Sequence, residues 1–592
     1  MDKQLQSLIA EIESASGKTD ADMHMTNLRI LDVYTETVYP GAMVIKNGKI
    51  VAINPTWTVQ AQQVFDGRGM FAVPGFMDAH VHIETTLLTP EALASITVPW
   101  GTTTMFVDGM EIANVLGIKG LRALLRNTAN LPFRIFMQVP SRVPTAPGLE
   151  TTGGVLGVEE VDELLDDETA VSLGELDPSK VLEIKEEYLK KILSAKKRNK
   201  ICNGHAIGLD WDQLNVYATA GLSDDHESVE YEELYERLRL GLRALIREGS
   251  TERNVDKLIA GVIKHHLPTE DLLFCTDDKH VNDIADEGHI SYNIQKAIDL
   301  GMDPVKAIKI GTINAARHFR IDHLLGALSP GKFADIVLLK DLNHIRPEYV
   351  FKGGVPVATN GKLHREIAGD YPNFLKSTVT LSPDFCPFDF SVPAEGNKAK
   401  VKVINLYPDQ IINFETEEWL DVCDGVIAAN VDDDVLKLSV VERYGKNGQV
   451  GSAFVRGFKL RSGALASSVS HDHHNIVTVG TNDSDMYLAA KELEKCQGGF
   501  VAVENGVVKG ILPLPIGGLM SCDPANKVMQ EIDALNRVVR DMGSELPSPF
   551  MTLSFVSLPT VPELGLTDHG LINVKTHRIV PVSYTHLRAH ET

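Results

Sequence analysis

Two histidines one residue apart, His80 and His82, carry the first indication of chemistry in the sequence. They end an apolar run from Phe71 to Glu84 (FAVPGFMDAHVHIE) that is typical of a β-strand. Because side chains alternate along a strand, both imidazoles face the same side. Two neutral imidazoles directed at one point provide half of a metal site, although paired histidines on a strand are often simply exposed.

Three further residues of metal-ligand type stand where strands are expected to end. His205 lies in ICNGHAIGL, His226 lies in DDHE, and Asp277 closes the apolar segment Leu272 to Asp277 (LLFCTD). In a barrel of parallel strands all such ends converge on the C-terminal face, where the loops build active sites. We therefore expect these side chains to join the histidine pair, although Asp277 could instead cap the following helix.

The elements that must position these residues follow an alternating pattern. From Val73 to about Phe319, apolar strands alternate with helical patterns such as Tyr231 to Glu248 (YEELYERLRLGLRALIRE). Repetition of strand and helix over about 250 residues is typical of a (β/α)₈ TIM-type barrel. The sequence therefore predicts the α/β class, with the metal-ligand residues at one end of the barrel.

Shorter strands flank the predicted barrel on both sides. Leu28 to Asn54 alternates in polarity, and Asn47-Gly48 permits the type I′ turn of a hairpin. Ala334 to Lys340 and Val355 to Gly361 return to short strands. These later strands could complete the sheet that begins before the barrel.

The same patterns divide the chain into units. Pro372 to Pro393, rich in proline, serine and aspartate, is expected to link the barrel to a separate α+β region, Lys400 to Val582. The final residues, Val582 to Thr592 (VSYTHLRAHET), do not continue the preceding alternation and resemble a cloning or assembly scar. The predicted units are a small β domain (1–73 plus 320–370), the metal-binding barrel (74–319), a C-terminal α+β domain (371–582) and a non-native tail (583–592).

Composition narrows the expected partners and compartment. The 592 residues are enough for two or three domains, and the formal net charge of -23 repels nucleic-acid phosphates and anionic membranes. The six cysteines lie far apart without a CxxC pair, which favours reduced thiols over a disulfide framework or a thiolate zinc site. Since no apolar run is long enough to span a bilayer, we expect a cytoplasmic protein with a small-molecule substrate, no nucleic-acid partner and no membrane association.

Several motifs together resemble one known family. In the predicted barrel they are PGFMDAHVHIE (74–84), NGHA (203–206), SDDHE (223–227), CTDDKH (275–280) and EGHI (287–290). In the C-terminal region they are RSGALASSVSHDHHN (461–475), VGTNDSDM (479–486), LPLPIGGLM (512–520) and PFMTLS (549–554). In this order, over nearly the whole chain, they resemble the adenine deaminase family of the amidohydrolase superfamily.

The resemblance implies a binuclear metal centre. One cation would be bound by His80, His82 and Asp277, the other by His205 and His226, with Glu175 of Leu173-Gly174-Glu175 as the bridging carboxylate. Manganese or iron is implied, and zinc suits the same imidazole and carboxylate ligands. Two cations lower the pKa of a bridging water, and the resemblance implies that the resulting hydroxide would attack C6 of adenine. Asp277 would accept its proton and relay it to the departing amine, giving hypoxanthine and ammonia.

Other polar residues of the barrel are candidates for contact with the substrate. Asp278, Lys279 and His280 directly follow the last predicted ligand, although each could equally be a solvated loop residue. Glu287 and His289 could donate or accept a proton, although a carboxylate before glycine often caps a helix.

A dense polar cluster follows an apolar and serine-rich run in the C-terminal region. It comprises His471, Asp472, His473, His474 and Asn475, and it resembles the family's loop that reaches over the active site. A fortuitous surface cluster is the alternative. We take His471, Asp472 and His474 as candidates for substrate binding, and whether the cluster binds metal or substrate stays open.

The sequence departs from the family pattern on two predicted loops. Where adenine deaminases carry Asp-Pro-His-Glu before Ile-Ala-Asn, this chain has Asp108-Gly109-Met110-Glu111. Methionine is a weak acceptor that cannot shuttle protons, whereas Asp108 and Glu111 remain as candidate substrate contacts. After Glu175, the usual Asn-Phe-Pro-Gly is replaced by LDPS (176–179). Such loops set substrate choice more than metal binding.

Three functions are therefore compatible with these residues. The first is hydrolytic deamination of adenine, and the second is hydrolysis of another aminated purine or a cyclic amide by the same chemistry. The third is a non-catalytic metal-binding scaffold, against which the retention of every expected ligand type argues. The resemblance also implies a homo-oligomer, with a dimer as the expected form.

Overall fold

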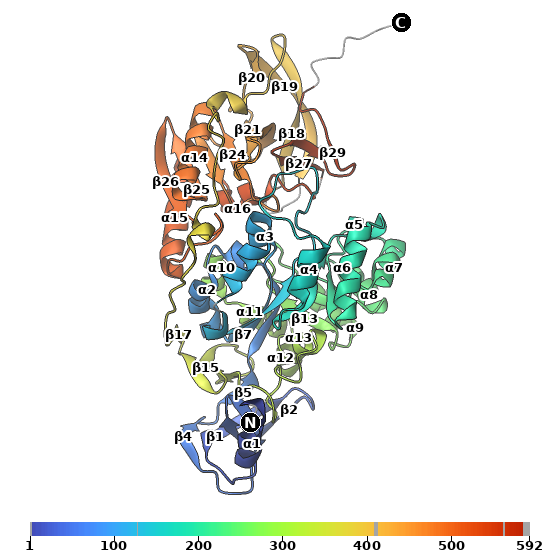
Figure 1. The fold of residues 1–592 in the computed structure, drawn as a ribbon, viewed down its shortest axis with the longest axis vertical. Helices are drawn as coiled ribbons and strands as arrows, with labels where there is room; N and C mark the ends of the chain where they lie inside the picture. Colours follow the sequence, from blue (N-terminus) through green and yellow to red (C-terminus); the bar gives the residue numbers. More distant parts are fainter. Residues whose placement is uncertain (1–2, 127, 408–412, 561–562, 584–592) are drawn as a thin grey trace.

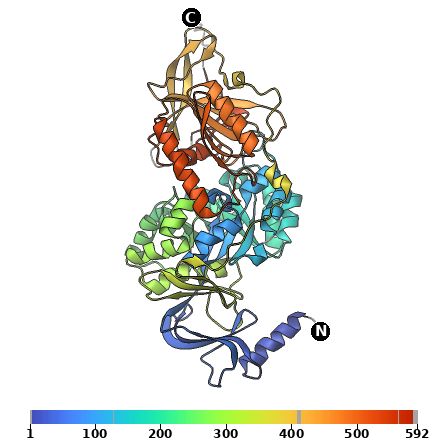
Figure 2. The same cartoon turned by 90° about the vertical axis from the view of Figure 1, so that its left-hand side faces the viewer.

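The molecule is elongated, with three regions stacked along its long axis. The computed structural model describes residues 3–126, 128–407, 413–560 and 563–583. In Figure 1 the N-terminal strands lie at the bottom, the barrel in the middle and the C-terminal strands at the top. The view turned by 90° in Figure 2 shows the same order, with α1 extending from the bottom region. None of the described helices is long and apolar enough to cross a membrane.

Parallel strands form the middle region. Among the described residues, a five-stranded sheet runs in the order β10-β9-β8-β7-β6 and a three-stranded sheet in the order β11-β12-β13. The amide of Ser223 donates to the carbonyl of Cys202 (2.8 Å) and that of Asp277 to the carbonyl of His80 (3.0 Å), which joins the two sheets on both sides. The strands are β6 (Phe76–Val81), β7 (Thr102–Asp108), β8 (Arg134–Val139), β9 (Ala170–Leu176), β10 (Ile201–Gly204), β11 (Asp224–Asp225), β12 (Arg243–Arg247) and β13 (Leu272–Cys275).

Helices follow these strands and cover the outside of the ring. They are α2 (Pro90–Thr97), α3 (Met110–Leu125), α4 (Val158–Leu165), α5 (Pro178–Leu182), α6 (Glu186–Lys197), α7 (Trp211–Ala220), α8 (Tyr231–Arg239), α9 (Val255–His265), α10 (Val281–Glu287), α11 (Ile290–Asp299), α12 (Pro304–Ile310) and α13 (Ile313–His318). The TIM-type α/β fold predicted from the sequence is confirmed.

The helix predicted over residues 231–248 is present only in the first half of that range. The helix α8 ends at Arg239, and the segment Arg243–Arg247 is the buried strand β12. Gly241 between them has a φ of 78°, in the left-handed region that glycine adopts without strain. The helical spacing of apolar residues continued by coincidence into a short strand whose residues are buried on both faces.

One flanking sheet contains strands from before and after the barrel. Its order is β17-β16-β15-β14-β5-β1-β2-β3, with β4 pairing with β1. Asn47 and Gly48 have φ values of 52° and 77°, as the predicted type I′ turn between β2 and β3 requires. The elements are α1 (Lys3–Ala15), β1 (Ala21–Asp32), β2 (Thr37–Lys46), β3 (Lys49–Ile53), β4 (Ala61–Asp66), β5 (Phe71–Pro74), β14 (Ile336–Leu339), β15 (Pro347–Lys352), β16 (Val355–Thr359) and β17 (Lys362–Leu363).

The C-terminal region is rich in strands. Within the described residues its main sheet has the order β20-β19-β18-β22-β21-β24-β23-β25-β26, and β27, β28 and β29 form a second sheet. The strands are β18 (Lys398–Leu406), β19 (Asn413–Cys423), β20 (Val426–Ile427), β21 (Val435–Val441), β22 (Val450–Arg456), β23 (Ala464–Ser467), β24 (Ile476–Gly480), β25 (Gly499–Glu504), β26 (Val507–Pro513), β27 (Leu564–Thr567), β28 (Gly570–Asn573) and β29 (Arg578–Ile579). The helices are α14 (Asp483–Cys496), α15 (Ala525–Asp541) and α16 (Pro549–Phe555).

The predicted domain limits stay predictions, and the predicted tail lies almost wholly outside the described residues. Ser583 pairs with Val401 as an isolated bridge.

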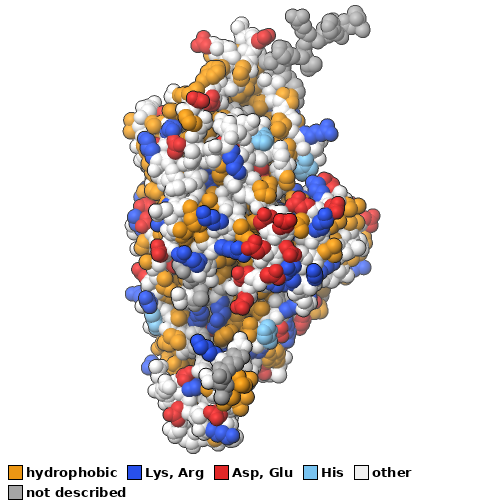
Figure 3. Space-filling view, in the orientation of Figure 1, with side chains coloured by type: hydrophobic (Ala, Val, Ile, Leu, Met, Phe, Trp, Pro, Cys, Tyr) orange, Lys and Arg blue, Asp and Glu red, His pale blue; other side chains and the backbone are white. Residues whose placement is uncertain are grey.

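On the face shown in Figure 3, acidic and basic side chains are interspersed. Ion pairs such as Lys190 with Glu186 and Arg198 with Asp162 occur on the barrel helices.

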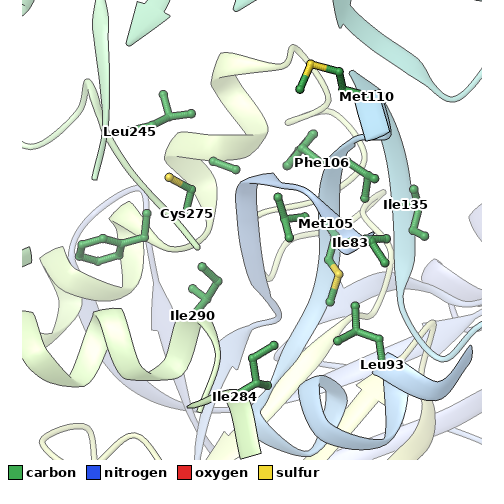
Figure 4. Close-up of a cluster of buried hydrophobic side chains, with 14 of the residues drawn as sticks. Ile83, Leu93, Met105, Phe106, Met110, Ile135, Leu245, Cys275, Ile284 and Ile290 are labelled. Atoms are coloured by element: carbon green, nitrogen blue, oxygen red, sulfur yellow. The ribbon is translucent and has the colours of Figure 1, made fainter. Parts of the chain in front are cut away.

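The barrel core packs tightly beneath the ends of the strands. Figure 4 shows Met105 and Phe106 of β7 close to Ile83, with Met110 above them. Phe106 is completely buried, and its ring stacks on Phe319 with the centroids 3.9 Å apart. This packing supports the strand ends from which the candidate ligands project.

Replacing Phe106 with alanine should destabilise the barrel. We expect a loss of about 3–5 kcal/mol in the free energy of unfolding, because the substitution leaves a cavity in a closely packed core. Chemical denaturation followed by circular dichroism measures it. Phe388, which is 70% exposed, provides the matched control, and Phe388→Ala should change stability by no more than about 0.5 kcal/mol. Equal effects of the two substitutions would contradict the assignment of Phe106 to the core.

Candidate metal centre and substrate pocket

The first and last barrel strands together present three of the predicted ligands. His80 lies in β6 and His82 directly follows that strand, whereas Asp277 lies just beyond β13. The amide of Asp277 donates to the carbonyl of His80 (3.0 Å), and the amide of His82 donates to the carbonyl of Asp277 (3.3 Å). Backbone pairing therefore fixes these residues beside one another at the C-terminal end of the barrel.

These three side chains surround one point. The Nε2 atoms of His80 and His82 each lie 3.7 Å from Oδ1 of Asp277, and all three residues are buried. These separations are too long for hydrogen bonds. They suit atoms that share a cation at about 2.0–2.2 Å from each. The group forms one of the sets whose ligand atoms lie within 4.8 Å of one another.

Glu175, at the end of β9, faces all four histidines. Its Oε2 lies 3.0 Å from Nε2 of His226, 3.3 Å from Nδ1 of His205 and 3.7 Å from Nε2 of His80. Its Oε1 lies 3.9 Å from Nε2 of His82. A carboxylate between two groups of imidazoles has the position of a bridging ligand.

Glu227 is a candidate ligand that the sequence reasoning missed. Its Oε1 lies 3.3 Å from both Nδ1 of His205 and Nε2 of His226, and these three residues form a further candidate metal-binding set. Arg247 donates through Nη1 to Oε1 of Glu227 (2.8 Å) and to Oδ2 of Asp277 (3.0 Å). The signal was present in the sequence, because Glu227 directly follows His226.

The Nδ1 atoms of His80 and His82 are held by neighbouring acceptors, so that the Nε2 atoms face the centre. Nδ1 of His80 lies 2.6 Å from Oε1 of Gln138, whose amide nitrogen donates to the carbonyl of Ala79. Nδ1 of His82 lies 2.9 Å from the carbonyl of Asp108. Because both partners are acceptors, each Nδ1 carries a proton, which leaves Nε2 as the ring atom that can bind a cation.

The buried polar atoms also fit a cation. Nε2 of His80 is buried and has no hydrogen-bond partner among the described residues. Burial, with the neighbouring His226 and His82, lowers the pKa of His80 to about 4, so this imidazole is neutral near pH 7. Although burial opposes it, the charges of Arg142 and His205 hold the pKa of Glu175 well below its usual value. Neutral imidazoles and ionised carboxylates are the forms that bind divalent metals.

A pocket opens directly beside this centre. The space not filled by protein atoms is about 650 Å³, part of which is open to solvent. The barrel contributes Met110 and Ile207 among its lining, and the C-terminal region contributes Phe555, Leu558 and Thr560. Both regions of the chain therefore enclose the candidate metal centre.

The predicted substrate-binding residues divide into two groups. Glu111, Asp278, His471 and Asp472 line the pocket, whereas Asp108, Lys279, His280 and His474 are absent from its described lining. Oδ2 of Asp108 accepts from the amide of Glu175 (3.3 Å). Nζ of Lys279 lies 4.6 Å from the ring centre of Tyr292, and His280 precedes the first turn of α10.

The two other predicted catalytic residues also lie away from the described pocket lining. Glu287 accepts from Nη1 of Arg253 at 2.8 Å. The buried His289 lies 2.9 Å through Nδ1 from the hydroxyl of Thr102 and 3.2 Å through Nε2 from Oδ2 of Asp78. Any part that Glu287 or His289 plays in proton transfer would therefore be indirect.

Contacts between the two regions close the pocket. Arg142 contacts Glu175 and lies 3.6 Å through Nη1 from Oδ2 of Asp472. The ring of His471 stacks on Phe555, with the centroids 4.4 Å apart. A loop of the C-terminal region therefore reaches groups of the metal centre through one arginine.

Comparison with known protein families identifies the chain as an amidohydrolase. The amidohydrolase family model matches residues 71–363, which include the barrel and its candidate ligands. The model of the adenine deaminase C-terminal domain matches residues 410–578.

Relatives then specify the family. The adenine deaminase of Desulforamulus reducens is 67% identical over 576 residues, which cover 97% of this chain and 98% of the relative. Adenine deaminase 2 of Carboxydothermus hydrogenoformans is 39% identical over 97% of this chain and 99% of the relative. The adenine deaminase of Halalkalibacterium halodurans is 39% identical over 96% of each. The chain belongs to the adenine deaminase family, as its motifs indicated.

Replacing Glu175 with glutamine should weaken metal binding. The variant keeps the size of the side chain but removes the charge that four imidazoles face, so we expect affinity for a divalent cation to fall by at least about 100-fold. Metal analysis after desalting measures it. Glu287→Gln, which alters a carboxylate paired with Arg253, should retain its metal. Unchanged metal content in Glu175→Gln would contradict a bridging role.

Proposed function

We propose that this protein hydrolyses adenine to hypoxanthine and ammonia. Membership of the adenine deaminase family through both regions of the chain supports this activity. The observation that carries it is the convergence of four histidines, Glu175 and Asp277 beside one pocket. The reaction consumes one water, whose oxygen replaces the amino group at C6 of the purine.

The ligand set favours two divalent cations. His80, His82 and Asp277 would hold one and His205 and His226 the other, with Glu175 between them and Glu227 beside the second. Manganese or iron is our proposal, and zinc suits the same ligands. When bound, such a pair lowers the pKa of water and supplies a nucleophile near neutral pH.

Asp277 is our candidate for the proton transfer. Its Oδ2 is fixed by Arg247 at 3.0 Å, while its Oδ1 faces the imidazoles. Although burial opposes it, the charges of His226 and Arg247 hold the pKa of this carboxyl below its usual value. The ionised carboxylate can accept a proton from the attacking water and deliver it to the departing amino group.

The remaining lining suits a flat heterocycle with polar edges. Phe555, Leu558 and Ile207 provide apolar contact, whereas Glu111, Asp278, His471 and Asp472 provide hydrogen-bonding groups. We propose that these polar side chains contact the edge of the purine and orient C6 toward the metal centre. Asp108 accepts from the amide of Glu175 and His474 lies beside Glu111, so we propose that both support the site rather than touch the substrate.

Met110 is the observation that favours a second candidate function. Its side chain lines the pocket, and the resemblance of the sequence to the family predicts a histidine at this position. A thioether there changes the polarity of the wall, so the same chemistry could act on another aminated purine or on a cyclic amide. A non-catalytic scaffold is a weaker candidate, because the ligand types are all retained.

The assembly and compartment are also proposals. We propose a homodimer in the cytoplasm, where the scattered cysteines would stay reduced. Light scattering coupled to size-exclusion chromatography measures the mass of the particle against the 64.9 kDa of one chain.

A substrate screen of the manganese-loaded enzyme tests the activity. We expect ammonia release from adenine to exceed that from other aminated purines and from cyclic amides, because the metal centre and both family regions are present. Enzymatic determination of ammonia provides the measurement. Turnover of one of the other substrates without turnover of adenine would reject the adenine assignment.

Met110→His tests whether this departure controls substrate choice. We expect kcat/KM for adenine to rise by about tenfold, the equivalent of one added hydrogen bond of about 1.4 kcal/mol. Met110→Leu, which keeps an apolar side chain of similar volume, should leave kcat/KM nearly unchanged. A fall in adenine turnover for the histidine variant would show that this pocket needs an apolar side chain here.

A further inference from the structure

A second group of metal-ligand side chains lies where the barrel meets the C-terminal region. Glu111 is the second residue of α3, whereas His471 and His474 lie in the loop between β23 and β24. Nδ1 of His471 lies 3.2 Å from Oε1 of Glu111, and Nε2 of His474 lies 3.6 Å from Oε2 of the same carboxylate. The three residues are buried, and one ligand atom from each lies within 4.8 Å of the others.

His474 is the unexplained member of this group. Its side chain is completely buried, and neither ring nitrogen has a hydrogen-bond partner among the described residues. Oε2 of Glu111, the nearest carboxylate oxygen, is likewise buried without a hydrogen bond. A buried polar atom without a partner lowers the stability of the fold. A cation between these atoms would satisfy both of them.

The loop that carries the histidines is held firmly. The amide of His474 donates to the carbonyl of Ser470 (2.7 Å), and the side-chain amide of Asn475 donates to the carbonyl of Thr151 in the barrel (2.8 Å). The hydroxyl of Tyr444 donates to the carbonyl of His473 (3.0 Å). Because neighbouring groups position the loop, it presents His474 to Glu111 without requiring any rearrangement.

One acidic neighbour of Glu111 also suits a cation. Glu84 accepts a hydrogen bond from the amide of Ile112 (3.1 Å), so a second buried carboxylate lies beside Glu111 at the start of α3. Oε2 of Glu84 has no hydrogen-bond partner among the described residues. Burial and the charge of Glu111 raise the pKa of Glu84 to about 8, because two adjacent buried carboxylates repel each other when both are ionised. A positive ion bound by Glu111 would offset that repulsion.

We propose that Glu111, His471 and His474 form a third divalent-cation site, separate from the two-metal centre. Two imidazoles and one carboxylate suit zinc and other first-row transition metals. Glu111 and His471 line the substrate pocket and His474 does not, so the cation lies in the pocket wall. Because its ligands come from both regions, the ion ties the C-terminal region to the barrel.

This site goes beyond the proposed deamination, which the two-metal centre can support without it. The competing explanation is a direct ion pair between Glu111 and a protonated His471. That pair would leave His474 with no partner, and it predicts no additional metal. Counting bound ions therefore separates the two explanations.

Metal stoichiometry of the full-length chain tests the third site. The protein is stripped with a chelator, reloaded with Zn²⁺, desalted and analysed by inductively coupled plasma mass spectrometry. We expect three zinc ions per chain in the unaltered protein and two in His474→Ala. His473→Ala is the matched control, because His473 is equally buried but lies 3.1 Å from the hydroxyl of Ser557. That control should retain three ions.

Two outcomes would overturn the proposal. They are two ions in the unaltered protein, or equal counts in the unaltered protein and His474→Ala. Should the variant fail to fold, anomalous X-ray scattering at the zinc edge from crystals of the unaltered protein decides the question. A peak within coordination distance of Glu111, His471 and His474 supports the site, and a map without a peak there rejects it.

Discussion

Burial of mutually facing imidazoles and carboxylates at the end of the barrel is the constraint on which the rest of the structure depends. Taking a carboxylate out of water is costly unless opposite charge is close. Arg142 and Arg247 supply that charge to Glu175, Glu227 and Asp277 from the outer side. On the inner side the carboxylates face histidine nitrogens at distances that suit shared cations.

The barrel provides this arrangement through its strand ends. Its parallel strands direct the ligand residues to one face, and the pairing of His80 with Asp277 joins the first strand to the last. Gln138 and the carbonyl of Asp108 then fix the orientation of the histidine rings. The core around Phe106 supports these strands from below.

The C-terminal region completes the site rather than merely following it. Asp472 reaches Arg142, His471 reaches Glu111, and Phe555 forms part of the pocket wall. The pocket wall therefore contains side chains from both regions, and Met110 is one of the barrel residues in it.

The sequence predicted the barrel and the ligand types because both depend on local patterns. Strand alternation, His-x-His and acidic strand ends can be recognised without knowing the fold. It did not predict Arg142 or Arg247, since their roles arise from segments that meet only in three dimensions. Glu227 was missed although it directly follows His226 in the sequence. Nor did the sequence reveal which way the side chains point. Lys279 contacts the ring of Tyr292, and His289 contacts Thr102 and Asp78. The prediction of a helix beyond Arg239 was wrong because the apolar residues of a short strand buried on both faces can have helical spacing.

The most direct test of the metal centre is the dependence of adenine hydrolysis on added metal. Enzyme stripped with a chelator is titrated with Mn²⁺ while ammonia release from adenine is followed. We predict no release from the stripped enzyme and recovery of turnover as the cation is returned. Full turnover by protein shown to be metal-free would contradict a catalytic metal centre at the end of the barrel.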